Sequence, residues 1–250
     1  VVRGCIPKKY MVYASEFGRS LEHMKGYGWK VENASYDHNL FMDRMHREID
    51  RLSGIYARNL RNAGAELIDD RAEFVDPHTL RLVKSGKTVT AGKVLIAMGG
   101  HTSVPKSIEG VEHAITSNEM FHLDKLPEHI VIIGGGYIAV EFAGIMSGLG
   151  VKVCLAIRKD LVLRGFDEDV RTQVHEELKR KGVKVITSAM PTKIEKKADG
   201  RFTVHFSNGE TASGDKVLLA VGREPNTAGV GLDKAGVKLN DKGAVIVDEY

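Results

Sequence analysis

The sequence has few cysteines, no long apolar run and no strong excess of one charge. Its two cysteines, Cys5 and Cys154, are too few to staple a secreted scaffold, so any cysteine chemistry is expected to be local and redox in kind. No run approaches the roughly 18 apolar residues of a membrane span, and no signal-peptide pattern occurs, so we expect a cytoplasmic protein without a membrane partner. The 36 basic and 33 acidic residues are spread evenly, which argues against nucleic acid as a partner.

An initiator methionine is also missing, since the chain opens with Val1 directly before a dense motif. It closes as abruptly at residues 247–250, so we expect both ends to cut through folded structure. The length fits one or two domains, and the 42% hydrophobic content is ordinary for a globular protein.

The first half of the chain predicts a long helix followed by short strands. Apolar residues repeat with a helical period over residues 39–62, and Gly64 is placed to end that helix. Three short strands are predicted next, at residues 65–68, 79–83 and 94–97. The last of them is expected to be buried and to end at Gly99. A domain boundary is predicted within residues 105–118.

The second half alternates between strands and helices, which is typical of a doubly wound parallel sheet. The predicted order is strand, glycine turn, helix, strand, helix and strand, at residues 130–133, 134–136, 138–149, 152–157, 167–181 and 183–187. An antiparallel hairpin is expected to follow, with strands 201–206 and 216–220 and type I′ turn chemistry at residues 207–210.

The glycine turn reads G-x-G-x-x-A, which is the fingerprint of dinucleotide binding. Gly134 makes the tight turn, Gly136 admits the pyrophosphate, and Ala139 lets the helix pack closely on the strand. Gly135 and Ile138 complete the set, and free N–H groups at the helix start hold the phosphates. A plain glycine-rich turn is the alternative, but the apolar strand before it and the apolar helix after it favour nucleotide binding.

The residues after the second strand favour NADPH over NADH. An NAD enzyme presents an acid there to the ribose 2′-hydroxyl, whereas this chain has Ile157 followed by Arg158. Arg158 can donate charge-assisted hydrogen bonds to a 2′-phosphate, with Arg164 converging from the next loop. The alternative is a solvated basic edge made of these arginines and Lys159.

Cys5 stands among three cations, Arg3, Lys8 and Lys9, which would favour its thiolate and hence redox or nucleophilic reactivity. A half-buried structural cysteine is an equally open interpretation. Cys154 lies in the middle of a predicted strand and is expected to behave as a small buried hydrophobe.

Four ordered motifs together resemble the pyridine nucleotide-disulfide oxidoreductases, and most closely the glutathione reductases among them. They are Gly4 to Lys9, Gly136 to Glu141, Arg158 with Arg164 to Asp167, and Gly222 to Thr227. The resemblance covers residues 1–250 and implies an α/β, three-layer Rossmann-like FAD/NAD(P)-binding fold, a parallel sheet with an inserted antiparallel β-meander. It divides the chain into a partial FAD domain with the redox-cysteine helix, an NADPH domain and a return into the FAD domain, at residues 1–115, 116–240 and 241–250.

The resemblance also implies roles for the redox residues. Cys5 would be the flavin-side cysteine of a C-x-x-x-x-C pair, whose partner would directly precede Val1. Lys8 would lie near the flavin and pair with Glu141, and Tyr137 would cover the flavin until nicotinamide displaces it. A surface glutamate and a core tyrosine are the respective alternatives for Glu141 and Tyr137.

Further positions follow from the same resemblance. Ala72 and Gly99 are implied to contact FAD, although Met98 replaces the usual threonine of Ala-Thr-Gly and puts a local hydrogen bond in doubt. Gly222 would allow close approach of the coenzyme. Ile55 and Tyr56 would line the wall for the disulfide substrate, whereas periodicity alone places them in the core.

The implied parent is an NADPH-dependent, FAD-containing homodimer that reduces glutathione disulfide, with no metal, while the chain as given is expected to be inactive. Trypanothione reductase, mercuric reductase and dihydrolipoamide dehydrogenase are the rivals within the family. The last normally presents an acid where this chain has Arg158. A non-catalytic NADPH-binding module is the rival from another class.

Overall fold

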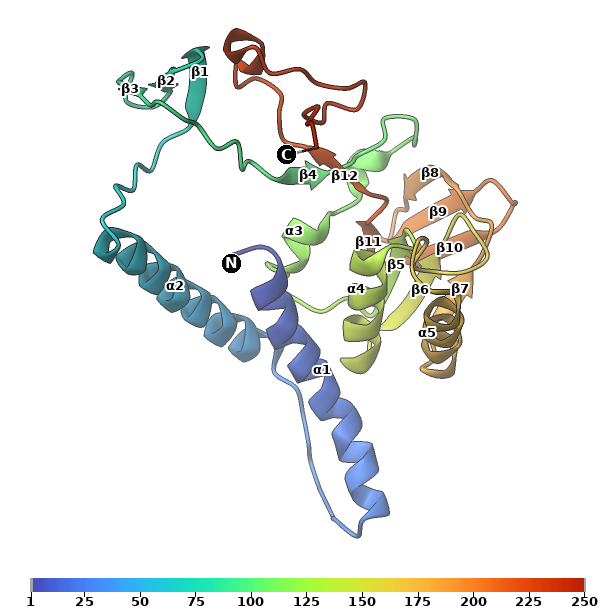
Figure 1. The fold of residues 1–250 in the computed structure, drawn as a ribbon. Helices are drawn as coiled ribbons and strands as arrows, with labels where there is room; N and C mark the ends of the chain where they lie inside the picture. Colours follow the sequence, from blue (N-terminus) through green and yellow to red (C-terminus); the bar gives the residue numbers. More distant parts are fainter. Residues whose placement is uncertain (1, 250) are drawn as a thin grey trace. The chain divides into compact units, whose positions relative to one another are not determined.

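The computed structural model describes residues 2–249 and divides them into two compact units (Figure 1). The first unit joins residues 2–56 to Val104–Gly222, and the second joins Ala57–Ser103 to residues 223–249. None of the helices in these residues has the length and apolar character needed to cross a membrane.

The first unit is built on a four-stranded parallel sheet with strand order β11-β5-β6-β7. Its strands are β5 (His129–Ile133), β6 (Lys152–Ala156), β7 (Lys184–Ile186) and β11 (Lys216–Leu219). The central strand β5 is almost entirely apolar because both of its faces are covered. Ile130 and Ile132 enter one core, whereas Val131 and Ile133 enter the other.

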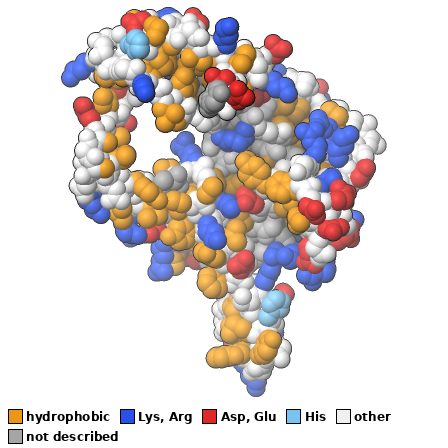
Figure 2. All heavy atoms as spheres, in the orientation of Figure 1, with side chains coloured by type: hydrophobic (Ala, Val, Ile, Leu, Met, Phe, Trp, Pro, Cys, Tyr) orange, Lys and Arg blue, Asp and Glu red, His pale blue; other side chains and the backbone are white. Residues whose placement is uncertain are grey.

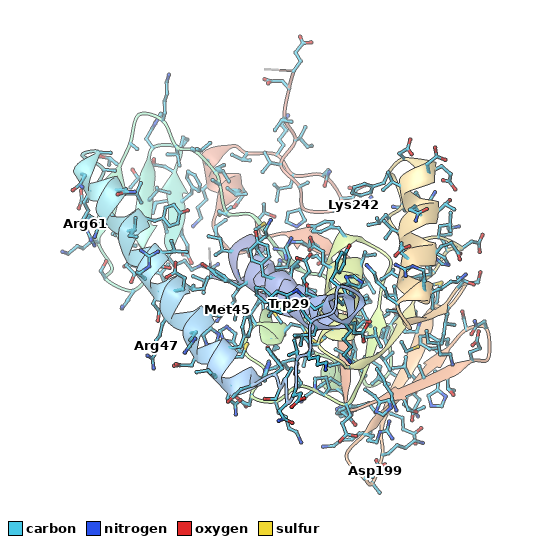
Figure 3. The ribbon with its side chains drawn as sticks, turned by 90° about the horizontal axis from the view of Figure 1, so that it is seen from below. Trp29, Met45, Arg47, Arg61, Asp199 and Lys242 are labelled. Atoms are coloured by element: carbon cyan, nitrogen blue, oxygen red, sulfur yellow. The ribbon has the colours of Figure 1, made fainter. Side chains whose placement is uncertain are left out.

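Helices cover one face of this sheet. The crossover helices are α4 (Tyr137–Gly148) and α5 (Glu168–Arg180), and α1 (Cys5–Gly26), the first half of α2 (His38–Asn62) and the short α3 (Ser117–Met120) pack against the same core. Figure 3 shows Met45 on the side of α2 that faces α1, and Arg47 pointing away from it. The far end of α1 and the segment after it carry hydrophobic side chains in the open (Figure 2), including Phe17, Tyr27 and Trp29.

An antiparallel sheet covers the opposite face, with strand order β10-β9-β8. It consists of β8 (Pro191–Lys196), β9 (Phe202–Phe206) and β10 (Thr211–Gly214). Ile194, Val204 and Phe206 from this sheet share a core with the parallel sheet. The first unit therefore has three layers, which confirms the predicted Rossmann-like fold with an inserted β-meander.

The predicted hairpin is wrong in its second strand and in its turn. Its second strand is β10, while most of the segment predicted for that role forms β11 and lies parallel to β5. The apolar run of β11 suits a doubly covered sheet, so burial decides its place. In the turn only Gly209 has a positive φ, and Phe206 N donates to Glu210 O, which makes a three-residue loop rather than a type I′ turn.

The second unit contains two small antiparallel sheets. One has the order β1-β2-β3, formed by β1 (Ala72–Asp76), β2 (Thr79–Leu82) and β3 (Thr88–Thr90). The other pairs β4 (Gly100–Thr102) with β12 (Arg223–Pro225). Residues 2–249 also contain two 3₁₀ turns, η1 (Val111–His113) in the first unit and η2 (Leu232–Ala235) in the second.

Two strands predicted for the second unit are not formed. Residues 65–68 and 94–97 are irregular, and Leu95 is 90% exposed rather than buried. A strand needs a neighbour to satisfy its N–H and C=O groups, and none of the strands among residues 2–249 pairs with either segment. The apolar composition of residues 94–97 was therefore insufficient to predict their structure.

The helical predictions agree with the structure to within one or two residues at each end, and Gly64 has the positive φ expected after α2. The compact units, however, differ from the expected domain boundaries. Residues 223–240 belong with Ala57–Ser103, because β12 pairs with β4 and Leu232 shares a core with Phe74. Residues 2–56 belong to the same compact unit as the four-stranded parallel sheet, because α1 packs against α4.

Candidate nucleotide-binding and thiol site

The loop between β5 and α4 requires glycine for steric reasons. Gly134 has φ 130°, and a Cβ there would lie 2.2 Å from the carbonyl oxygen of Ala220. A Cβ on Gly135 would lie 3.3 Å from Ile157 Cγ2, at the end of the neighbouring strand. The loop is thus pressed against the carboxyl ends of β11 and β6.

Gly136 is different, because a Cβ there would meet nothing within 4 Å. It is the N-cap of α4 and offers no side-chain cap, so the first N–H groups of the helix are free to bind an anion. Ala139, one turn on, is completely buried and lets α4 lie close to the sheet. These residues fit the pyrophosphate of a dinucleotide, with open space where the phosphates would sit.

The predicted selectivity residues follow β6. Ile157 is buried, and the chain then turns outward so that Arg158 and Arg164 are both exposed. Within residues 2–249, neither guanidinium has a hydrogen bond or an ion pair. The loop that carries Arg164 is fixed to the glycine turn, since Leu163 N donates to Gly135 O at 2.6 Å. Leu163 adopts a left-handed φ of 56° there.

Gly222 completes this end of the sheet. It follows β11 with φ 151°, and a Cβ there would meet nothing within 4 Å. Ala220 N donates to Ile133 O, which holds the chain before Gly222 beside the glycine turn. The structure therefore brings the predicted coenzyme residues of the first unit to one edge of the parallel sheet.

Lys8 and Glu141 form an ion pair between α1 and α4. Lys8 Nζ lies 2.6 Å from Glu141 Oε1, and the two side chains are 23% and 34% exposed. Glu141 is therefore neither an unpaired buried carboxylate nor an isolated surface residue. An ion pair shielded to this degree is screened less by salt than one in full solvent.

Cys5 is an exposed free thiol at the first position of α1. It opens onto a hollow of about 390 Å³, lined also by Ile6, Lys9, Tyr10 and Tyr13. Two of the three cations expected around it have other partners, since Lys8 pairs with Glu141 and Arg3 Nε donates to His122 Nε2 at 3.4 Å. Lys9 lines the same hollow, but its Nζ lies over the Tyr13 ring, 5.2 Å from the centroid. The positive end of the helix remains as the positive group at the sulfur.

The other implied residues are distributed over both units. Tyr137 begins α4 and is 55% exposed, which excludes a core tyrosine in this structure. Ile55 is half-buried and Tyr56 is 50% exposed, so neither is a core residue of α2. Ala72 lies in β1 and Gly99 precedes β4, both in the second unit.

Cys154 lies in β6 and is a different kind of thiol. Burial raises its pKa to about 11, and the nearby Lys184 ammonium offsets this only partly. Its partly buried side chain packs against the core beneath the β-meander. The expected role as a small core hydrophobe is consistent with this environment.

Sequence reasoning missed the close packing of α1 along α4. A Cβ on Gly18 would lie 2.9 Å from Gly148 O, and a Cβ on Gly148 would lie 2.8 Å from Ser15 Cβ. Arg19 Nη2 also donates to Gly144 O at 3.2 Å. The available signal was a small residue at intervals of three or four along both helices, which becomes informative only once the two are known to be neighbours.

Comparison with known proteins supports the same assignment. The chain matches the model of the pyridine nucleotide-disulphide oxidoreductases over residues 1–250. It is 42% identical over 261 residues to the glutathione reductase of Nostoc sp., and 41% identical over 251 residues to the chloroplastic/mitochondrial glutathione reductase of Pisum sativum. These alignments cover all of this chain but only 56% and 45% of the relatives, so the chain spans about half their length.

Solved structures agree on the fold. The HOCl-induced flavoprotein disulfide reductase RclA from Escherichia coli matches with a TM-score of 0.85 at 29% identity, over 99% of this chain and 53% of that one. LpdA from Mycobacterium tuberculosis matches with a TM-score of 0.87 at 24% identity, over 99% of this chain and 55% of that one, which supports the fold alone. FAD and NADPH are the cofactors used by flavoenzymes of the glutathione reductase type. By its motifs, its fold and these matches, the chain belongs to the pyridine nucleotide-disulphide oxidoreductase family.

Proposed function

We propose that this chain supplies the NADPH-binding unit and one redox cysteine of a flavoprotein that reduces glutathione disulfide to glutathione. The coenzyme half rests on the exposed guanidinium groups of Arg158 and Arg164 beside an open glycine turn, neither of which has a partner among residues 2–249. A 2′-phosphate supplies the doubly charged partner that these groups lack. No acid occupies the position after Ile157, where one would repel that phosphate.

The disulfide-reductase half is supported by Cys5 and its neighbours. Cys5 is an exposed thiol one helical turn before Lys8, whose ammonium is held by Glu141. When bound, FAD supplies the two-electron relay between nicotinamide and the redox disulfide. The chain's own part is to hold the Lys8 ammonium in a fixed direction and to present the Cys5 sulfur. Tyr137, at the exposed start of α4, is proposed as the gate over the flavin.

Two protein cysteines are needed to reduce glutathione disulfide by thiol–disulfide exchange. The reduced pair attacks glutathione disulfide, and one glutathione leaves as a mixed disulfide forms with the protein. The second protein thiol then attacks this mixed disulfide, which releases the second glutathione and restores the protein disulfide. Each cycle consumes one NADPH and one proton and yields NADP⁺ and two glutathione molecules. We propose Cys5 as the flavin-side member of the pair, with its partner directly before Val1.

A substrate comparison on the full-length protein tests this proposal. We expect NADPH oxidation to be fastest with glutathione disulfide, and much slower with trypanothione disulfide, mercuric ion or a lipoamide substrate. Equal or higher rates with one of these would transfer the assignment to that rival. A full-length protein without flavin absorbance would instead favour a non-catalytic NADPH-binding module.

The assembly and location of the full-length protein also belong to the proposal. We propose a homodimer, and the apolar side chains in the open along α1 are of the kind that protein interfaces bury. We propose a cytoplasmic location, although the Pisum sativum relative is named as chloroplastic/mitochondrial. Sedimentation and cell fractionation of the full-length protein test the two points separately.

A further inference from the structure

Two contacts between α1 and α4 are separated by two helical turns along each helix. The Lys8–Glu141 ion pair lies near the start of both helices, and the Ser15–Gly148 contact lies seven residues further along each of them. Both contacts therefore have the same sequence offset, which is the pattern of two helices that run side by side in parallel (Figure 1). Fixing the second contact restricts where the first can form.

The second contact is the tightest part of this packing. Gly148 leaves no room for a Cβ, which would lie 2.8 Å from Ser15 Cβ and 2.9 Å from Ser15 O. Carbon atoms normally approach no closer than about 3.5 Å, so a methyl group at Gly148 would force the helices apart or rotate them. Ser15 is itself buried, with its hydroxyl bonded to Val12 O, and cannot move aside freely.

A hydrogen bond reinforces this register. The Arg19 side chain extends back along α1 and donates from Nη2 to Gly144 O at 3.2 Å, midway between the two contacts on α4. Long helical side chains normally point toward the helix N-terminus, so this bond requires no unusual rotamer. It opposes both sliding and separation of the helices.

We propose that Gly18, Gly148 and Arg19 are positioning residues for the Lys8 ammonium and thereby for the thiol end of α1. They lie two turns or more from Lys8 and contact neither it nor Cys5. They act by setting the distance and register of α1 on α4, which lets the Lys8–Glu141 pair form. The consequence for electron transfer rests on the role proposed above for Lys8, whereas the structural consequence does not.

Gly148→Ala is the direct test, and Gly144→Ala is its matched control. Both replace a glycine in α4 by alanine, but a Cβ on Gly144 would meet nothing within 4 Å. The measurement is a double-mutant cycle of Lys8→Met and Glu141→Gln in the 250-residue chain, read from hydrogen–deuterium exchange of the α1 amides. The coupling is the factor by which one substitution changes the effect of the other on the opening equilibrium of the α1 amides. We expect this factor to be about two or more in the unmodified chain and in Gly144→Ala. In Gly148→Ala the coupling is lost.

Arg19→Met provides a second test that adds no bulk, in case Gly148→Ala does not fold. Its control is Arg47→Met on α2, because among the described residues Arg47 pairs only with Asp43 on the same helix. We expect Arg19→Met to weaken the Lys8–Glu141 coupling and Arg47→Met to leave it intact. Full coupling in Gly148→Ala, or in Arg19→Met if Gly148→Ala is unfolded, would overturn the inference.

The full-length flavoprotein separates this inference from the proposed function. Gly148→Ala should lower kcat for NADPH-dependent disulfide reduction and leave KM for NADPH unchanged, because the glycine turn lies at the opposite end of α4. Gly144→Ala should change neither. If the coupling is lost while kcat stays unchanged, the positioning is upheld and the role proposed for the Lys8–Glu141 pair is contradicted.

Discussion

Arg158 and Lys159 are adjacent, exposed cations at the end of β6, but only one of them is expected to bind the coenzyme. We predict that Arg158→Glu weakens NADPH binding by about 10- to 100-fold, because a charged hydrogen bond worth about 1.5–3 kcal/mol is replaced by repulsion. NADH binding should change little. Fluorescence titration of both coenzymes measures the effect.

Lys159→Glu is the control for this prediction, since it makes the same charge change one residue away. A similar loss of NADPH affinity in both variants would indicate a diffuse basic edge rather than a 2′-phosphate site. An unchanged preference in Arg158→Glu would contradict the assignment of NADPH to this loop.

The two thiols should differ sharply in reactivity. We predict that iodoacetamide modifies Cys5 rapidly at pH 8 and Cys154 very slowly, because a pKa of about 11 leaves only about one Cys154 thiol in a thousand ionised. Mass spectrometry of the two tryptic peptides measures the rates, with urea-unfolded chain as the control in which the difference disappears. Comparable rates in the folded chain would show that Cys154 is accessible and its pKa is not raised.

The same pKa predicts a loss of stability in alkali. The folded state holds the Cys154 proton more tightly than the unfolded state, in which the pKa is near 9.0. Above that pH the unfolded state binds fewer protons, so the free energy of unfolding falls as the pH rises from about 9 toward 11. Urea unfolding of Cys154→Ala should lack this part of the pH dependence, whereas an identical profile in both proteins would refute it.

The turn before α4 combines two kinds of glycine. Gly134 is required by the fold, since its Cβ would strike the Ala220 carbonyl, whereas Gly136 has room for one. The space beside Gly136 is needed only when a pyrophosphate lies there. Stability and coenzyme binding should therefore respond differently at the two positions.

We predict that Gly136→Ala folds with a melting temperature close to that of the unmodified chain but binds NADPH at least tenfold more weakly. Gly134→Ala should have a lower melting temperature and should also bind NADPH more weakly. Its φ of 130° disfavours a side chain, and an added Cβ would strike the carbonyl oxygen of Ala220. Calorimetry and coenzyme titration of the two variants check this. Normal NADPH binding by Gly136→Ala would place the pyrophosphate elsewhere.

The elements that could be predicted from sequence are those fixed by neighbours along the chain. The strand and helix around the turn at Gly134 each show a hydrophobic period and local start and stop residues. Helix α5 does so as well, and its N-cap Asp167 accepts a hydrogen bond from Asp169 N. The pairing of β4 with β12 joins residues more than a hundred positions apart and has no local signal. The place of β11 beside β5 was missed for the same reason.

The two compact units are each assembled from separate stretches of sequence. The chain crosses between them after Tyr56, Ser103 and Gly222, so neither unit can be read as one continuous segment. The compact units therefore differ from the expected boundaries, which divided the chain into three continuous segments. Only the contacts of residues 223–249 with Ala57–Ser103 reveal their common unit.

We predict that the purified 250-residue chain binds NADPH but does not reduce glutathione disulfide. Its cysteines, Cys5 and Cys154, are both free, and they lie on an exposed helix start and inside a sheet respectively, so they cannot serve as one redox pair. Following NADPH absorbance with glutathione disulfide present, before and after adding FAD, measures this. Sustained turnover by the chain would contradict the two-cysteine mechanism.

The hydrogen bond from Leu163 to Gly135 has a consequence for redesigning coenzyme preference. This bond joins the backbone of the loop that carries Arg164 to the backbone of the glycine turn, which is proposed to hold the pyrophosphate. Exchanging this loop for that of an NADH-dependent protein would therefore also weaken binding of the pyrophosphate, which NADH and NADPH have in common. To change the preference of this chain from NADPH to NADH, the glycine turn and the Arg164 loop would have to be exchanged together.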